Sequence, residues 1–234
     1  MKRNIVAIIG ARSGSKSIKN KNIKILGKIP LIAWSIKLCK KSKLITNIVV
    51  STDSKKYANI ATKFGAHNVI LRPKNISQDK STDYEMIDHT IKNLKLKNYE
   101  YIALIRPTTP LRKVKIIDKA LKFFIKSKFN SLRSVHQLPE TSYKTLEISS
   151  KNILKPLKGL KLSLDDLNKP QEFFKKTYIP NGYIDILKKN CILKNKKLFG
   201  NKVYGFVTEN VTEIDSLKEY EFLKYQVKNR TYLK

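Results

Sequence analysis

The sequence predicts an α/β protein built on an open, mostly parallel sheet with helices on both faces. Short apolar runs rich in Ile and Val alternate along the chain with longer segments whose apolar residues recur at helical spacing. The runs are continuously apolar, which is typical of strands buried on both faces of a parallel sheet. With 234 residues and 41% hydrophobic content, we expect a single domain over residues 1–234 with a substantial core.

The first strands and helices follow one another closely. One strand is predicted at residues 4–10 (NIVAIIG) and a second at 47–53 (NIVVSTD). Between them, a helix over 30–42 begins at Pro30, because proline fits the first turn of a helix. After the second strand, the segment SKKYANIATKFGA predicts a helix that is closed by Gly65.

Two further strand and helix pairs continue this rhythm. The third strand is NVILRP at 68–73, and the helix after it opens with Thr82 and Glu85 in the spacing of a capping box. The fourth strand is YIALIRP at 101–107. It is followed by the helix VKIIDKALKFFIKS, in which we expect one side to bury Ile116, Ala120, Phe123 and Phe124.

The segment 137–190 breaks the rhythm. It holds SYKTLEI, a lysine-rich stretch and TYIPNGYIDIL, which has two strand-like halves around the turn PNG. We therefore expect a β-rich segment inserted into the domain. The regular pattern returns with the strand KVYGFVT and a last helix, SLKEYEFLKYQV, in which Ser216 and Glu219 match a capping box.

The formal charge of +31 suggests a polyanion as partner, either nucleic acid or an anionic membrane surface. The distribution of the charge argues against both. Only seven of the 49 basic residues are arginine, and the lysines are scattered through every segment, as a biased genomic base composition would leave them. Nucleic-acid readers usually gather charge on one face and use arginine. We expect no nucleic-acid and no membrane partner, and a basic RNA-binding protein is the alternative from another class.

Nothing in the sequence indicates export or membrane insertion. No apolar stretch approaches the roughly eighteen residues of a membrane span, and the N-terminal run at 5–11 is short and ends at Arg12. Cys39 and Cys191 show neither metal-ligand spacing nor a disulfide framework, which fits a reducing compartment. We expect a cytoplasmic protein.

The segment GARSGSKSIKNKN, residues 10–22, follows the first predicted strand directly. Glycine lets backbone N–H groups approach phosphate oxygens, and Arg12, Lys16 and Lys21 are cationic partners for a triphosphate. The segment is not a Walker A loop, because its two glycines are one residue too close and Ser15 stands before Lys16. A solvated basic turn is the alternative.

Six ordered blocks span nearly the whole chain: GARSGSKSIKNKNI, VVSTDS, VILRP, RPTTPLR, IPNGYIDI and TEIDSLKEYE. In this order they resemble the acylneuraminate cytidylyltransferase family, which makes CMP-activated nonulosonic sugars such as sialic acid. The family's A-R-x-x-S-K and K-N pattern is met by Ala11, Arg12, Ser15, Lys16, Lys21 and Asn22. The resemblance implies a nucleotidyltransferase-type, Rossmann-like sheet with its active site beyond the strand ends. It also implies a homodimer, in which the inserted segment serves dimerisation and lends residues to the neighbouring subunit's sugar pocket.

The family reaction joins CTP and an acidic sugar into a CMP-sugar and pyrophosphate. The sugar's anomeric hydroxyl attacks the α-phosphorus, so charge builds on the phosphate oxygens and on the departing pyrophosphate. The resemblance assigns catalysis to Arg12 and Lys21, which would grip the triphosphate. It assigns CTP binding to Ala11, Ser15, Lys16, Asn22, Arg72 and Thr82, although the plain role of Thr82 is a helix N-cap.

Mg²⁺ is the expected cofactor, because a hard cation binds both phosphate and carboxylate oxygens. The family carries a D-x-D pair before the last helix, where this chain has Glu213 and Asp215. Alternation along an extended segment would point both carboxylates the same way. Asp53 is a further candidate. The alternative for Asp53 and Asp215 is structural, because each precedes a helix, whose N-terminus favours a carboxylate.

The sugar end departs from the family pattern. Arg106 replaces the glutamine of the common Q-P-T-S-P-L-R block, and Gln171 falls where an R-Q-x-L-P block has arginine. Our hypothesis is that Arg106 compensates by meeting the carboxylate of an acidic sugar. The predicted sugar pocket comprises Arg106, Arg112, Gln171, Tyr178 and Asn181. The departures leave open a Kdo-like or other sugar as acceptor, or a nucleotide binder without turnover.

Overall fold

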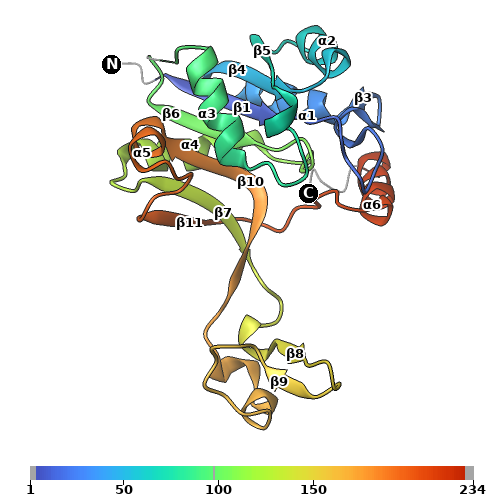
Figure 1. Ribbon diagram of the computed structural model, residues 1–234, viewed down its shortest axis with the longest axis vertical. Helices are drawn as coiled ribbons and strands as arrows, with labels where there is room; N and C mark the ends of the chain where they lie inside the picture. The colour runs from blue at the N-terminus through green and yellow to red at the C-terminus, as the bar shows by residue number, and fades with distance from the viewer. Residues whose placement is uncertain (1–3, 97, 230–234) are drawn as a thin grey trace.

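A seven-stranded sheet forms the centre of the computed structural model, which describes residues 4–96 and 98–229 (Figure 1). The strand order across the sheet is β11-β7-β10-β6-β1-β4-β5. The strands are β1 (Ile5–Gly10), β4 (Ile45–Thr52), β5 (Asn68–Leu71), β6 (Tyr101–Ile105), β7 (Ser131–Gln137), β10 (Tyr178–Lys188) and β11 (Val203–Val207). Among them only β10 runs against its neighbours. The predicted open, mostly parallel sheet is confirmed.

The apolar run of β1 explains why both faces of the sheet are covered. Ile5, Ala7 and Ile9 are buried in one apolar cluster, and Val6 and Ile8 are buried in another, because strand side chains alternate. Helices on both faces, as predicted, supply the rest of these clusters. The first face carries α1 (Leu31–Lys41), α2 (Lys55–Lys63) and α4 (Val114–Lys126), and the second carries α3 (Asp83–Asn93) and α5 (Lys189–Asn195).

The last helix, α6 (Leu217–Lys228), packs beside the first part of the chain. It contacts a small hairpin made of β2 (Ile25–Leu26) and β3 (Ile29–Pro30). The Tyr220 hydroxyl donates to a main-chain carbonyl of β2, and Leu223 is fully buried in the apolar cluster that α6 shares with the hairpin. This packing fixes the segment before α6 next to the loop after β1.

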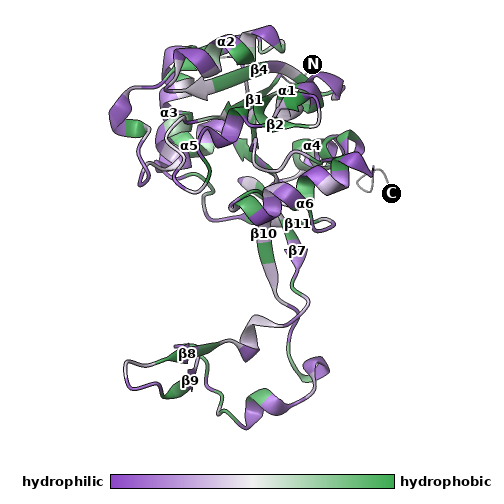
Figure 2. Cartoon of the chain, turned by 90° about the vertical axis from the view of Figure 1, so that its right-hand side faces the viewer, coloured by the Kyte–Doolittle hydropathy of each residue, from purple (hydrophilic) through white to green (hydrophobic). Residues whose placement is uncertain are grey.

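Residues 138–177 form a lobe that projects from the main body on the extended ends of β7 and β10 (Figure 1, Figure 2). It contains the hairpin of β8 (Leu146–Ile148) and β9 (Leu154–Pro156), together with short 3₁₀ turns and loops. The lobe is smaller and less β-rich than the insert predicted at 137–190. The difference arises because the chain from Tyr178 onward returns to the main body as β10 and α5.

Two further differences from the predicted elements are local. β10 is one strand with an irregularity between Pro180 and Asp185, where the sequence predicts two halves. In α4, Ile117 and Leu121 are buried but Phe123 is 38% exposed, because the helical period turns Phe123 away from the sheet. Neither α4 nor any other helix in the described residues is long and apolar enough to cross a membrane.

Candidate active site

A cleft of about 480 Å³ opens at the carboxyl ends of the strands, between the loops that follow β1 and β6. The strand order reverses here, since β4 and β6 pair with opposite sides of β1. Ligands of open parallel sheets bind at such a crevice. The lining residues are Gly10, Arg12, Ser15, Lys16, Ser17, Lys21, Asn22, Arg72, Gln78, Ser81, Thr82, Asp83, Met86, Arg106, Pro107, Thr108 and Asp215.

The loop after β1 is anchored by Asp53, which follows β4. The Ser13 backbone N–H donates to Asp53 Oδ1 at 2.7 Å, and the Ser13 hydroxyl donates to Oδ2 at 2.8 Å. Gly10 lets α3 come close to the start of the loop, because a Cβ there would lie 2.5 Å from the Met86 sulfur. Asp53 supports the loop and does not line the cleft, in contrast to Asp215, the other metal candidate before a helix.

Arg12 and Lys16 share one carboxylate at the cleft. Arg12 Nη1 lies 2.9 Å from Asp79 Oδ1, and Lys16 Nζ lies 2.5 Å from Asp79 Oδ2. Ser15 also lines the cleft. Ala11, a predicted nucleotide-binding residue, is fully buried behind the lining, where its N–H donates to a main-chain carbonyl of β4. The structure therefore brings Arg12, Ser15 and Lys16 to the cleft and leaves Ala11 beneath it.

The basic loop meets the acidic segment before α6. Lys21 Nζ donates to the Ile214 carbonyl at 2.9 Å and to Asp215 Oδ1 at 3.2 Å. The Lys21 side chain is 14% exposed, whereas that of Asp215 is 74% exposed. Asn22 is buried in the cleft wall and donates to the Arg12 carbonyl at 2.9 Å. Two parts of the chain that are remote in sequence thus form one wall of the cleft.

Arg72 and Thr82 both line the cleft, and the side chain of Thr82 also has a structural role. Burial lowers the pKa of Arg72, and its Nε has no hydrogen-bond partner among the described residues. Thr82 is the N-cap of α3. Its hydroxyl accepts from the Glu85 N–H at 3.2 Å, and Glu85 accepts from the Thr82 N–H at 2.6 Å. The predicted capping box is confirmed, and Arg72 keeps a buried donor at the edge of the cleft.

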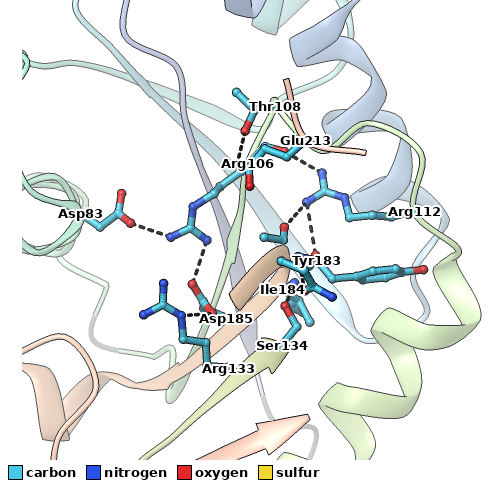
Figure 3. A network of polar contacts seen from close by, with 12 residues as sticks. Asp83, Arg106, Thr108, Arg112, Arg133, Ser134, Tyr183, Ile184, Asp185 and Glu213 are labelled. Atoms are coloured by element: carbon cyan, nitrogen blue, oxygen red, sulfur yellow. Dashed lines mark hydrogen bonds and ion pairs between the residues drawn. The ribbon is translucent and has the colours of Figure 1, made fainter. Parts of the chain in front are cut away.

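Arg106 lies between two carboxylates just after β6 (Figure 3). Its Nη1 is 2.8 Å from Asp185 Oδ2, and its Nη2 is 2.7 Å from Asp83 Oδ2. Asp185 is 2% exposed, and Arg133 Nε lies 3.8 Å from its other oxygen. Burial disfavours the charge on Arg106, but the two carboxylates outweigh burial and raise its pKa. One arm of Arg106 is held by buried Asp185, and the other by Asp83, which is 42% exposed in the cleft.

The sequence analysis did not find Asp79, Asp83 or Asp185 as site residues. Asp185 carries a signal that could have revealed it, because a single carboxylate in the apolar strand GYIDIL needs a partner when the strand is buried. Asp83 and Asp79 carry no such signal. An aspartate is ordinary both in the first turn of a helix and in a polar loop.

Arg112, predicted in the sugar pocket, lies outside the cleft and behind the loop that follows β6. Its Nη2 donates to the Ser35 hydroxyl at 2.7 Å and to the Arg106 carbonyl at 2.9 Å. Its Nη1 donates to the Gly182 and Tyr183 carbonyls at 3.4 and 3.3 Å. Burial lowers the pKa of Arg112 to about 10, so the side chain remains protonated at neutral pH. Arg112 therefore holds the turn that carries Arg106 and does not face the cleft.

The other three predicted sugar residues also lie outside the cleft of their own chain. Asn181 is 4% exposed and donates to the Thr208 hydroxyl at 2.7 Å, which fixes the irregular part of β10. Gln171 lies in the lobe and donates to the Pro139 carbonyl at 2.8 Å. Tyr178 pairs with β7 where the lobe joins the sheet. Among the predicted sugar residues, Arg106 is the one that lines this cleft.

The acidic pair before α6 flanks a buried isoleucine. Ile214, which lies between the two acidic residues, is fully buried. Asp215 lines the cleft, whereas Glu213 does not: its Oε1 accepts from the hydroxyl of the lining residue Thr108 at 3.0 Å. No group of three or more His, Cys, Asp or Glu side chains within the described residues could hold a metal ion. Asp215 is the carboxylate of the pair that lies at the cleft, and Mg²⁺ usually binds through one or two carboxylates together with substrate phosphates.

Known proteins match the chain along almost its whole length. The cytidylyltransferase family profile covers residues 6–231. The N-acylneuraminate cytidylyltransferase of Escherichia coli O18:K1:H7 is 33% identical over 219 residues, or 92% of this chain, and the chain spans 49% of that relative's length. The CMP-N,N'-diacetyllegionaminic acid synthase of Legionella pneumophila is 31% identical over 216 residues, which are 89% of this chain and 88% of that protein.

A solved structure supports the predicted fold. The structure of CMP:2-keto-3-deoxy-manno-octonic acid synthetase in complex with CTP matches 97% of this chain and 99% of its own, with a TM-score of 0.73 and 11% identity. At that identity the likeness shows a shared nucleotidyltransferase-type α/β fold. The resemblance predicted from the six sequence blocks is confirmed, and the chain belongs to the cytidylyltransferase family.

Proposed function

We propose that this protein transfers CMP from CTP to the anomeric hydroxyl of an acidic nonulosonic sugar and releases pyrophosphate. The observation that carries the proposal is the contact of Lys21 with Asp215 in a cleft that Arg12, Lys16 and Arg72 also line. Cations suited to a triphosphate and a carboxylate suited to its metal thus share one site. The names of the relatives support the sugar class, since they refer to N-acylneuraminate and N,N'-diacetyllegionaminic acid.

In this proposal the protein positions charges and does little covalent chemistry. Arg12, Lys16 and Lys21 hold the triphosphate, so that charge developing on the phosphate oxygens and the departing pyrophosphate meets fixed cations. Asp215 and Glu213 are the residues that would hold Mg²⁺, which would supply further neutralisation of the phosphate charge. Arg72, Asn22 and the main chain around Ser81 are left to hold the cytidine.

Arg106 is proposed to bind the sugar carboxylate. Its contact with Asp185 is buried, but its contact with Asp83 faces the cleft, so a substrate carboxylate can replace Asp83 while Asp185 keeps the side chain in place. Arginine–carboxylate pairs are among the strongest polar contacts in proteins. A Kdo-like acceptor is the second candidate, because it presents the same carboxylate and because a synthetase for that sugar shares the fold.

We also propose a cytoplasmic homodimer in which the lobe serves the cleft of the other subunit. Gln171 and Tyr178 lie outside the cleft of their own chain, which leaves them available to a partner. The two cysteines, Cys39 and Cys191, are free thiols, which is compatible with a reducing compartment. The lobe exposes large apolar side chains, namely Leu146, Ile148, Ile153, Leu154, Leu157, Leu164 and Phe173.

The test is a turnover assay with purified protein, CTP, Mg²⁺ and a panel of nonulosonic acids and Kdo. The expected result is pyrophosphate release that depends on one of these sugars, and thermal protection by CTP with Mg²⁺ that exceeds protection by ATP. Protection without turnover on any sugar would indicate a nucleotide binder. Indifference to CTP, together with salt-sensitive binding of RNA, would favour the RNA-binding alternative and overturn the proposal.

A further inference from the structure

Asp79 makes two ion pairs with the loop after β1. It belongs to the segment between β5 and α3, and its carboxylate spans Arg12 at 2.9 Å and Lys16 at 2.5 Å. All three side chains remain accessible, with exposed fractions of 38% for Asp79, 34% for Arg12 and 85% for Lys16. A carboxylate thus engages both cations at a place that solvent can reach.

The two cations are those that the proposed function assigns to the triphosphate. A phosphate group and a carboxylate use the same N–H donors in the same charge-assisted geometry. A phosphate oxygen that binds Arg12 and Lys16 would also lie close to Asp79, and like charges at such a distance repel. Asp79 and a polyphosphate bound at this place would therefore compete for one pair of donors.

The loop is built so that this exchange leaves its backbone in place. Asp53 holds the main chain and hydroxyl of Ser13 with both carboxylate oxygens, whereas Asp79 contacts side-chain atoms. Arg12 and Lys16 can change partners while Asp53 keeps the loop anchored. Hydrogen bonding from Lys16 lowers the pKa of Asp79, so Asp79 is a competing anion throughout the neutral range.

We propose that Asp79 is a positioning residue that competes with polyphosphate for Arg12 and Lys16 and thereby promotes the release of pyrophosphate. The inference rests on the proposed function, which places the triphosphate on these cations. Exposed ion pairs of this kind are weak, so CTP with its several phosphate charges displaces Asp79. Pyrophosphate lacks the nucleoside, so it makes fewer contacts with the cleft than CTP does. Asp79 therefore displaces pyrophosphate from Arg12 and Lys16 more easily than it displaces CTP.

The experiment compares wild type with Asp79→Asn. Calorimetry measures the Kd of inorganic tripolyphosphate and pyrophosphate, and initial rates give KM for CTP and sugar and the Ki of pyrophosphate as product inhibitor. The expected result is a decrease of about two- to fivefold in both Kd values, in the CTP KM and in the pyrophosphate Ki. The sugar KM should not change, and Asp79→Glu should behave like wild type.

Asp88→Asn is the matched control, because Asp88 forms an ion pair of 2.6 Å with Lys92 on α3, and Lys92, unlike Arg12 and Lys16, does not line the cleft. Equal tightening in Asp88→Asn would show an effect of net charge and overturn the proposal. Weaker binding in Asp79→Asn, or no change, would also overturn it. If wild type binds tripolyphosphate but not CTP, the proposed function fails and the Asp79 comparison still stands. If wild type binds neither, both proposals fail.

Discussion

Lys21 and Asp215 are 194 positions apart in the chain, and the Lys21 ammonium lies 3.2 Å from the Asp215 carboxylate. The packing of α6 on the β2–β3 hairpin brings them together, and Lys21 also donates to the Ile214 carbonyl. The contact joins the end of the chain to its first loop at the cleft. The ammonium that we propose binds phosphate and the carboxylate that we propose binds Mg²⁺ are thereby held on one wall.

For Asp215→Asn we predict a fall in kcat of about 100-fold or more, because the variant loses the exposed carboxylate that would hold Mg²⁺ beside the phosphates. Pyrophosphate release measured across a range of Mg²⁺ concentrations checks this. Removing the metal from wild type with a chelator should produce the same loss. Near-normal turnover in Asp215→Asn, with Glu221→Gln as the control for a lost surface charge, would refute the assignment.

For Arg106→Gln we predict that the KM for the sugar rises by about tenfold or more, while the KM for CTP stays nearly unchanged. The variant should also be less stable by about 3 kcal/mol, because Asp185 loses its closest ion partner in a buried position. Kinetics with each substrate varied and urea unfolding provide the two measurements. Arg106→Lys serves as a second variant, because it keeps the positive charge beside Asp185. It shows whether the change in the sugar KM comes from the lost charge or from a destabilised fold. An equal rise in both KM values would count against a sugar-specific role.

For Phe173→Asp we predict a shift from dimer to monomer in sedimentation, since Phe173 is 74% exposed on the apolar surface of the lobe. Turnover should fall with the dimer, whereas thermal protection by CTP should persist because the cleft belongs to the main body. Phe222→Asp is a matched control, because Phe222 is 52% exposed on α6. A Phe173→Asp protein that remains dimeric would argue against the lobe as the interface.

Glu219 belongs to the capping box of α6, and its ionised carboxylate makes the stability of the fold depend on pH in the acid range. It accepts from the backbone N–H groups of Asp215 and Ser216, each at 2.7 Å, and these hydrogen bonds lower its pKa. A carboxyl with a lowered pKa in the folded state stabilises the fold fully above its unfolded value of about 4.5, and this contribution is lost as the pH falls further. Glu219→Gln should therefore cost about 0.5 kcal/mol at pH 7, because glutamine keeps an acceptor oxygen at this position of the capping box but loses the negative charge at the helix N-terminus.

Urea unfolding of Glu219→Gln and wild type at pH 7 and near pH 3 checks the sign of this effect. The difference in unfolding free energy should shrink at the lower pH, because Glu219 is then protonated in wild type. Glu221→Gln, on the same helix and paired with Lys224, serves as the control. A difference that stays constant with pH would mean that the ionised carboxylate is not the source of the stability.

The strands around β1 were predictable because their burial on both faces leaves a continuous apolar run in the sequence. β7 was not, since its sequence SLRSVHQ carries Arg133 and His136 among apolar residues and owes its place to the neighbouring β10 and β11. α5 was missed because seven residues are too few to show a helical period. The pattern of apolar residues therefore predicts which strands are buried on both faces, but it does not predict strands whose position depends on pairing with their neighbours.

The site shows a similar division. The structure brings Arg12, Lys16, Lys21 and Asp215, which the ordered blocks singled out, to one cleft. The same blocks could not say that Arg112 turns away from the cleft, because a position in a motif does not fix the direction of a side chain. The carboxylate partners of the cleft cations lie in distant segments, so their pairing depends on tertiary structure.

Where the lobe joins the sheet, the Leu138 N–H donates to the Thr177 carbonyl at 3.0 Å, so the two ends of the lobe are neighbours. Because the two ends of the lobe are adjacent, strands β7 and β10 can pair whatever the length of the segment between them. A longer or shorter lobe changes the entropy of closing this loop only slightly. Insertions, deletions or replacement of the lobe are therefore tolerated by the rest of the fold. The length and sequence of the lobe can thus diverge between relatives while the sheet and its cleft keep their architecture.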